Sequence, residues 1–141
     1  MSGTVNTQLQ DLFLDQFFSL PQADDFYLTG GTALSRFYLY HRESFDLDFF
    51  TNNQELKFAD FNIHLANISQ KLKLKTIKQV AGETYLQYIY EDPAAQILKI
   101  DLLKDFSPRF GKVKTLGKIK IDSLENIAVN KIMAIIGRTD T

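Results

Sequence analysis

The stretch that decides the fold is Phe26-Tyr-Leu-Thr-Gly-Gly-Thr-Ala-Leu-Ser-Arg-Phe-Tyr-Leu-Tyr-His-Arg-Glu-Ser-Phe-Asp-Leu-Asp-Phe-Phe50. Its apolar start predicts a short strand from Phe26 to Leu28, and the pair Gly30-Gly31 predicts a turn. A helix is expected from about Thr32 to Tyr40, and a second strand from about Ser44 to Phe50. The segment is therefore predicted to run strand, glycine turn, helix, strand.

The second strand presents two carboxylates on one face. Side chains alternate faces along a strand, so Ser44, Asp46 and Asp48 point to one side. The residues between them are apolar and predict a buried opposite face. Two residues of strand span about 6.5 to 7 Å, and both carboxylates can lean toward a common point. Because hard divalent cations prefer carboxylate oxygens, this strand predicts a cation site.

The glycine turn provides the complementary half of a phosphate site. Gly30 and Gly31 have no side chain to keep a ligand from the backbone, and they can adopt positive φ. The following helix points unpaired N–H groups and its positive dipole end at this turn, where anions are favoured. Opposite a strand that binds Mg²⁺, the turn predicts a site for a nucleoside triphosphate and its metal.

These residues resemble a known superfamily. Two glycines, a helix and then Asp-x-Asp on a strand are similar to the signature of the DNA polymerase beta nucleotidyltransferases. The string Gly30-Gly31-Thr32-Ala33-Leu34, followed by His41-Arg42-x-Ser44-x-Asp46-x-Asp48-Phe49-Phe50, resembles the AbiEii/AbiGii toxin branch of it. The resemblance covers nearly the whole chain. It implies an α+β fold, in which helices pack on one side of a mixed β-sheet.

The third expected strand, from Gln96 to Leu103, places Lys99 and Asp101 on one face and apolar side chains on the other. From the residues alone, a salt bridge between Asp101 and a base such as Lys99 explains the carboxylate as well as a functional role does. The superfamily, however, has a third carboxylate on a later strand beside the Asp-x-Asp strand. The resemblance therefore implies that Asp101 completes the metal site and helps to deprotonate the acceptor.

The resemblance also implies the ligands and their residues. Asp46, Asp48 and Asp101 are the expected catalytic and metal-binding residues, with Mg²⁺ or Mn²⁺ as the ion and a nucleoside triphosphate as the substrate. A lysine resembling Lys131 lies in a family helix after the third carboxylate strand, although this side chain can also simply reach solvent. The expected nucleotide-binding residues are Gly30, Gly31, Thr32, Arg42, Ser44 and Lys131.

Length and composition agree with one domain. The chain has 141 residues, of which 45% are hydrophobic, so it can bury a substantial core. Its formal net charge is -1, so a nucleic acid must be bound through local patches. It has no cysteine, which excludes disulfides, thiolate zinc sites and cysteine nucleophiles. No apolar run approaches the about 20 residues of a membrane span, and the cytoplasm is the expected location.

The remaining elements follow from periodicity and turn residues. Helices are expected over about 6–20 and 55–70, and His64 on the second is read as a packed or surface residue rather than a ligand. An antiparallel meander is expected from 71–80, 84–90 and 96–103. Residues 104–117 are read mostly as loop, before a short strand over 118–121. The lysines between Lys71 and Lys78 can contact RNA or DNA phosphates. Alternatively, they form a solvated strand face that protects the sheet edge from further pairing.

The last helix, from about Leu124 to Gly137, begins after a cap at Asp122 or Ser123. Its apolar arc exceeds the roughly 100° that one packed face requires. We therefore expect this helix to mediate a homodimer over residues 124–137, or to be covered by a further segment. The family continues through a helical segment with an Arg-Asp-x-x-Asp type motif, so the chain is expected to be an amino-terminal piece.

Three function classes remain open at this level. The first is a nucleotidyltransferase that moves a nucleoside monophosphate to an acceptor such as transfer RNA. By resemblance it would be the toxin of a toxin–antitoxin or phage-defence pair, with an antitoxin protein as partner. The second is a non-catalytic nucleotide-binding or protein-interaction module of the same fold. The third is a metal-dependent phosphohydrolase, since water can replace the acceptor.

Overall fold

The core of the fold is a seven-stranded mixed sheet with the strand order β3-β4-β5-β2-β1-β7-β6. The computed structural model describes residues 2–33, 38, 46–105 and 111–130. The strands are β1 (Phe26–Thr29), β2 (Asp46–Thr51), β3 (Lys75–Ala81), β4 (Tyr85–Glu91), β5 (Ile97–Lys104), β6 (Lys114–Leu116) and β7 (Ile119–Ile121). The helices are α1 (Ser2–Phe17), η1 (Pro21–Asp25), α2 (Gly30–Ala33) and α3 (Phe58–Lys71), and residues 124–130 are also helical.

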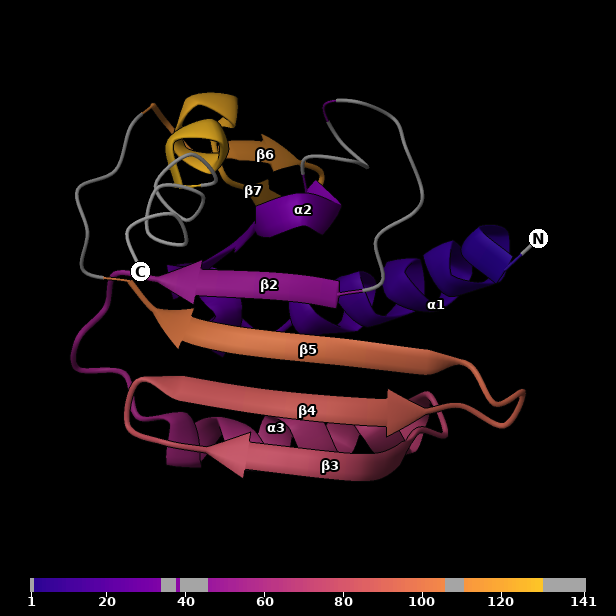
Figure 1. Cartoon of the computed structure of the whole chain (residues 1–141). Coiled ribbons are helices and arrows are strands. Elements are labelled where there is room, and N and C mark those ends of the chain that lie inside the picture. Colours follow the sequence, from indigo (N-terminus) through magenta and orange to yellow (C-terminus); the bar gives the residue numbers. More distant parts are fainter. Residues whose placement is uncertain (1, 34–37, 39–45, 106–110, 131–141) are drawn as a thin grey trace, which may run out of the picture.

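Strand pairing confirms the predicted mixed sheet and α+β class. In the middle of the sheet, β2 runs antiparallel to β1 and parallel to β5. The antiparallel meander of β3, β4 and β5 extends the sheet on one side, and β7 pairs parallel with β1 on the other. Both α1 and α3 lie behind the sheet in Figure 1, so the long helices share one face. No helix in the described part is long and apolar enough to cross a membrane.

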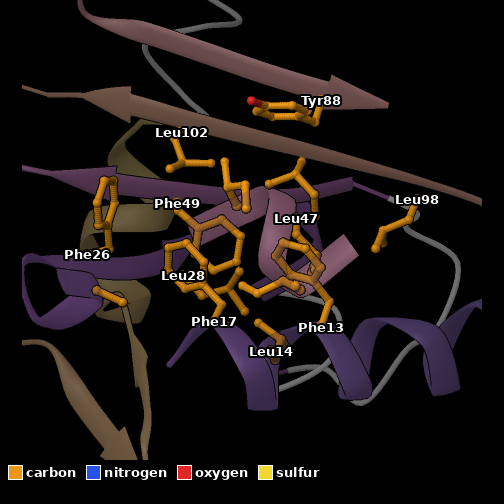
Figure 2. Close-up of a cluster of buried hydrophobic side chains, with 14 of the residues drawn as sticks. Phe13, Leu14, Phe17, Phe26, Leu28, Leu47, Phe49, Tyr88, Leu98 and Leu102 are labelled. Atoms are coloured by element: carbon orange, nitrogen blue, oxygen red, sulfur yellow. The ribbon is translucent and has the colours of Figure 1, made fainter. Parts of the chain in front are cut away.

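An aromatic core joins these helices to the sheet (Figure 2). Phe13 and Phe17 of α1 are fully buried, and the ring of Phe17 lies 4.2 Å from that of Phe49 on β2. From α3, Phe61 packs against Phe17 with a centroid distance of 6.0 Å. Both predicted helices are confirmed, with ends shifted by a few residues. His64 packs beside Phe61 with ring centroids 5.9 Å apart, as the packed reading expected.

The start of the predicted lysine-rich strand was wrong. Helix α3 continues to Lys71, and Lys73 adopts a left-handed φ of 56°. The N–H of Lys73 donates to the carbonyl of Gln70 and that of Leu74 to the carbonyl of Ser69, which together form a Schellman ending. This position usually carries glycine, so a lysine there hides the helix end from sequence reasoning. The alternation of lysine and leucine is therefore a helix terminus, and β3 begins only at Lys75.

The segment 104–117, predicted to be mostly loop, contains a short strand. Residues 114–116 form β6, which pairs antiparallel with β7 across a turn at Gly117. The strand has only three residues, and all three are exposed, so it carries no alternating pattern that would reveal it. Gly117 adopts a φ of 61°, which favours glycine at this turn.

Candidate active site

The carboxylates of β2 lie on the face of the sheet opposite the aromatic core. Leu47 and Phe49 are fully buried, whereas Asp46 and Asp48, which alternate with them, are only half-buried. This alternation confirms that both carboxylates point to the same side. The apolar residues therefore anchor β2 on the helices, and the strand holds its two acids toward the other face.

The third carboxylate stands directly beside the second. In the parallel pairing of β2 with β5, Asp48 is the register partner of Asp101, and Asp46 is the partner of Lys99. Neighbouring strands are about 4.8 Å apart, so the Asp48 and Asp101 side chains share one small region of the face. Leu98, Ile100 and Leu102 alternate with Lys99 and Asp101 and are buried. The prediction that the third acid lies on a strand next to the Asp-x-Asp strand is confirmed.

Strand β4 fixes the orientation of Asp101. The Tyr85 hydroxyl and the Gln87 amide both donate hydrogen bonds of 2.9 Å to Oδ1 of Asp101. Burial and the hydrogen bond to Asp101 raise the pKa of Tyr85 to about 12, so its phenol keeps the proton that it donates. The Asp101 side chain is only 15% exposed. Its second oxygen, Oδ2, is directed toward Lys99.

Lys99 lies between two of the acids. Its Nζ is 3.6 Å from Oδ2 of Asp46 and 3.8 Å from Oδ2 of Asp101. The salt bridge that competed with the functional reading of Asp101 therefore exists, and it extends to Asp46. Among the described residues, no three His, Cys, Asp or Glu side chains are arranged to hold a metal ion as they stand.

Asp48 is the acid with the strongest electrostatic perturbation. Burial, then the charges of Asp101 and Asp46, raise its pKa from 3.8 to about 7. A hydrogen bond with Asp101 contributes to the same rise, while the nearby Lys99 opposes it. Two acids side by side in a partly desolvated place cannot both ionise without cost. Asp48 therefore keeps its proton to a higher pH than a free carboxyl group does.

Gly30 closes the site on one side. It follows β1 directly, with a φ of 79°, and a Cβ added to it would lie 2.3 Å from Oδ2 of Asp48. Only glycine combines this backbone conformation with such an approach to the carboxylate. The expected positive φ is confirmed at Gly30, and the close neighbour that the structure shows is the Asp48 side chain. Gly31 and Thr32 follow within α2.

A buried polar network that sequence reasoning missed supports this turn. Asp122 is fully buried, and its Oδ2 accepts hydrogen bonds of 2.7 Å from Thr29 Oγ1 and from Asn126 Nδ2. Its backbone N–H donates to the carbonyl of Leu28. Thr29 precedes Gly30 and is the register partner of Asp48. Asp122 therefore ties the carboxyl end of β1 to the start of the last helix, where Ser123 accepts the capping bond from the Asn126 N–H.

The sequence offered only an ambiguous signal for this network. The sequence predicts either Asp122 or Ser123 as the cap of the last helix, and in the structure the cap is Ser123. The burial of Asp122 could not be inferred because its partner Thr29 is 93 residues away in the chain. Of the other predicted nucleotide-binding residues, Arg42, Ser44 and Lys131 lie outside the described residues.

Comparisons with known proteins give the family of the chain. The family model described as nucleotidyl transferase AbiEii toxin, type IV TA system, matches residues 12–141. The chain belongs to this family. No curated protein matches the sequence. The family assignment confirms the resemblance on which the sequence interpretation rested.

Solved structures show the same fold at low identity. JHP933 from Helicobacter pylori matches with a TM-score of 0.65 and 20% identity over 92% of this chain and 56% of that chain. MenT4, a nucleotidyltransferase toxin from Mycobacterium tuberculosis, matches with a TM-score of 0.57 and 12% identity. That match covers 93% of this chain and 52% of MenT4. The chain thus spans about half the length of these neighbours.

The donor set suits the divalent cation that a nucleotidyltransferase family implies. Hard cations such as Mg²⁺ take carboxylate oxygens, and Asp48 and Asp101 present theirs side by side. The approach of Gly30 to Asp48 leaves no room for a side chain at this point of the site. The single positive charge of the Lys99 ammonium leaves part of the charge of the three acids for such an ion to balance.

Proposed function

We propose that this chain is the catalytic part of a metal-dependent nucleotidyltransferase toxin. It would move a nucleoside monophosphate from a triphosphate to the hydroxyl of an RNA acceptor such as transfer RNA. The observation that carries the proposal is the register of β2 with β5, which sets Asp48 against Asp101 with Gly30 close above Asp48. Family membership supports the reaction type.

In this proposal the chain's acids have separate tasks. Asp46 and Asp48 hold the cation, and Asp101 completes the site and accepts the proton of the attacking hydroxyl. The hydroxyl oxygen forms a bond to the α-phosphorus while the bond between that phosphorus and the bridging oxygen breaks, so pyrophosphate leaves. A divalent ion bound there neutralises the charge of the phosphate oxygens. Tyr85 and Gln87 keep Asp101 oriented for the transfer.

The triphosphate is assigned to the turn after β1. Gly30, Gly31 and Thr32 would contact its phosphates through their backbone N–H groups. We include Arg42, Ser44 and Lys131 as further phosphate contacts on the strength of the family resemblance. The biological setting would be a cytoplasmic toxin–antitoxin or phage-defence pair, with an antitoxin protein as partner. Association of two copies through residues 124–137 belongs to the same proposal.

One incubation separates this reaction from a phosphohydrolase or a binding module. The chain is mixed with each α-labelled nucleoside triphosphate, Mg²⁺ and bulk cellular RNA, with a chelator sample as control. Label in RNA that requires Mg²⁺ supports the transferase. Free phosphate together with labelled nucleoside diphosphate, and no label in RNA, indicates a phosphohydrolase. An unchanged triphosphate that still binds the chain indicates a module.

A further inference from the structure

Lys99 is placed by the sheet itself at the centre of the acidic site. It projects from β5 between the buried residues Leu98 and Ile100, so its backbone position is fixed. Because Asp46 is its register partner across the parallel pair, its ammonium can reach both strands. The distances of 3.6 Å to Asp46 and 3.8 Å to Asp101 are those of ion pairs at both acids.

This ammonium and a divalent cation need the same oxygens. Both contacts of Lys99 are to Oδ2 atoms, and Oδ1 of Asp101 is already held by Tyr85 and Gln87. A lysine is a compact point charge on a flexible stem, so it can balance acids and move away without a change of the backbone. The Lys99 side chain is 35% exposed, which gives the ammonium a route to solvent.

We propose that Lys99 is a counter-cation of the site before metal binding, and that it competes with a divalent cation for Asp46 and Asp101. It keeps the two acids in place in the metal-free protein and leaves them when the ion binds. The inference rests on the proposed function only in requiring that these acids bind a divalent cation. A purely structural salt bridge would stabilise the sheet but would not oppose the ion.

The test measures the affinity for Mn²⁺ alone, by calorimetry or by the spin signal of the free ion, in the wild type and in Lys99→Met. Loss of a positive charge about 4 Å from the ligand oxygens should tighten Mn²⁺ binding about tenfold. The same variant should melt a few degrees lower without metal, because the acids lose their counter-charge. Lys99→Arg keeps the charge and should keep both wild-type values.

The matched control is Lys78→Met on β3, which makes the same change in net charge. Lys78 pairs with Ile89, and Ile89 pairs with Lys99, so the control lies in the same row about 10 Å away. Its effect on Mn²⁺ affinity should stay below about twofold, because charges at that distance are largely screened by salt. If Lys78→Met also tightened Mn²⁺ binding tenfold, the effect of Lys99→Met would come from the change in net charge alone. That result would overturn the proposal.

The outcomes separate this proposal from the proposed function. Equal Mn²⁺ affinity in the wild type and in folded Lys99→Met overturns the role of Lys99 and leaves the metal site intact. No binding in either protein, even with a triphosphate present, overturns both. If Lys99→Met does not fold, the wild type is titrated with Mg²⁺ while the side-chain nitrogen signals of Lys99 and Lys78 are followed by NMR. A shift of the Lys99 signal alone supports displacement, and an unmoved Lys99 signal refutes it.

Discussion

Replacing Asp48 with asparagine should stabilise the metal-free protein, and more so as the pH rises. The pKa of Asp48 is about 7 in the folded protein and 3.8 in the reference state. The folded protein therefore binds this proton more tightly than the unfolded chain does. The stabilisation from that proton is complete below about pH 4 and is lost as the pH rises through 7. Asparagine carries no charge, and its amide can donate to Asp101 as the protonated acid does.

The size of the Asp48 pKa shift determines how much stability Asp48→Asn is expected to gain. One pKa unit corresponds to about 1.4 kcal/mol, so the raised pKa costs at most about 4 kcal/mol at pH 8, where Asp48 is ionised. At pH 5, where folded Asp48 is protonated and the unfolded chain is not, the cost is about 2 kcal/mol. Solvent at the rim of the site screens part of this cost, and we expect Asp48→Asn to gain about 1 to 3 kcal/mol at pH 8. The gain at pH 5 should be about half as large.

The assay is urea unfolding with a chelator at pH 5 and pH 8. Asp46→Asn is the matched control, since the Asp46 side chain is 46% exposed and paired with Lys99, and its change should stay within about 0.5 kcal/mol. An Asp48→Asn variant that is less stable than the wild type at pH 8 would contradict the reasoning. An equal gain at both pH values would contradict it as well.

Three further variants test the supports of the site. Gly30→Ala should lose at least about 1 kcal/mol of stability and most transfer activity, because its Cβ meets Asp48. Gly117→Ala has a similar φ and nothing within 4 Å, so in melting experiments it should show the backbone strain alone. Tyr85→Phe combined with Gln87→Leu should slow transfer about tenfold at unchanged triphosphate affinity, since Asp101 loses both donors; unaltered transfer would show that the orientation of Asp101 is not limiting. Thr29→Val should cost about 1 to 2 kcal/mol in urea unfolding by leaving one bond of buried Asp122 unmade, and an unchanged midpoint would remove that bond from the account.

Local sequence patterns predicted the acids and the faces on which they lie. Alternation on β2 and β5 places Asp46, Asp48 and Asp101 correctly, because a half-buried strand has a period of two whatever its neighbours are. The register between the strands could not be read in this way. It depends on the packing of both strands on the helices, and it decides that Asp48 faces Asp101 while Asp46 faces Lys99.

The register also changes what a substitution is expected to do. In the structure Asp101 accepts bonds from Tyr85 and Gln87 and pairs with Lys99, so its charge is compensated. Asp48 is instead the acid whose ionisation is opposed by burial and by the neighbouring charges. The network around Asp122 was missed for a related reason, since long-range burial leaves no periodic signal.

Two labels on one triphosphate, followed in the wild type and in Asp48→Asn, test both the reaction type and the role of Asp48. With Mg²⁺ and RNA, the wild type should place the α-phosphate label in RNA and release the γ-phosphate label as pyrophosphate, in equal amounts. Asp48→Asn, shown to be folded by its melting curve, should reduce both products at least about 100-fold. Transfer of the γ-phosphate label to RNA, or full activity in Asp48→Asn, would contradict the account.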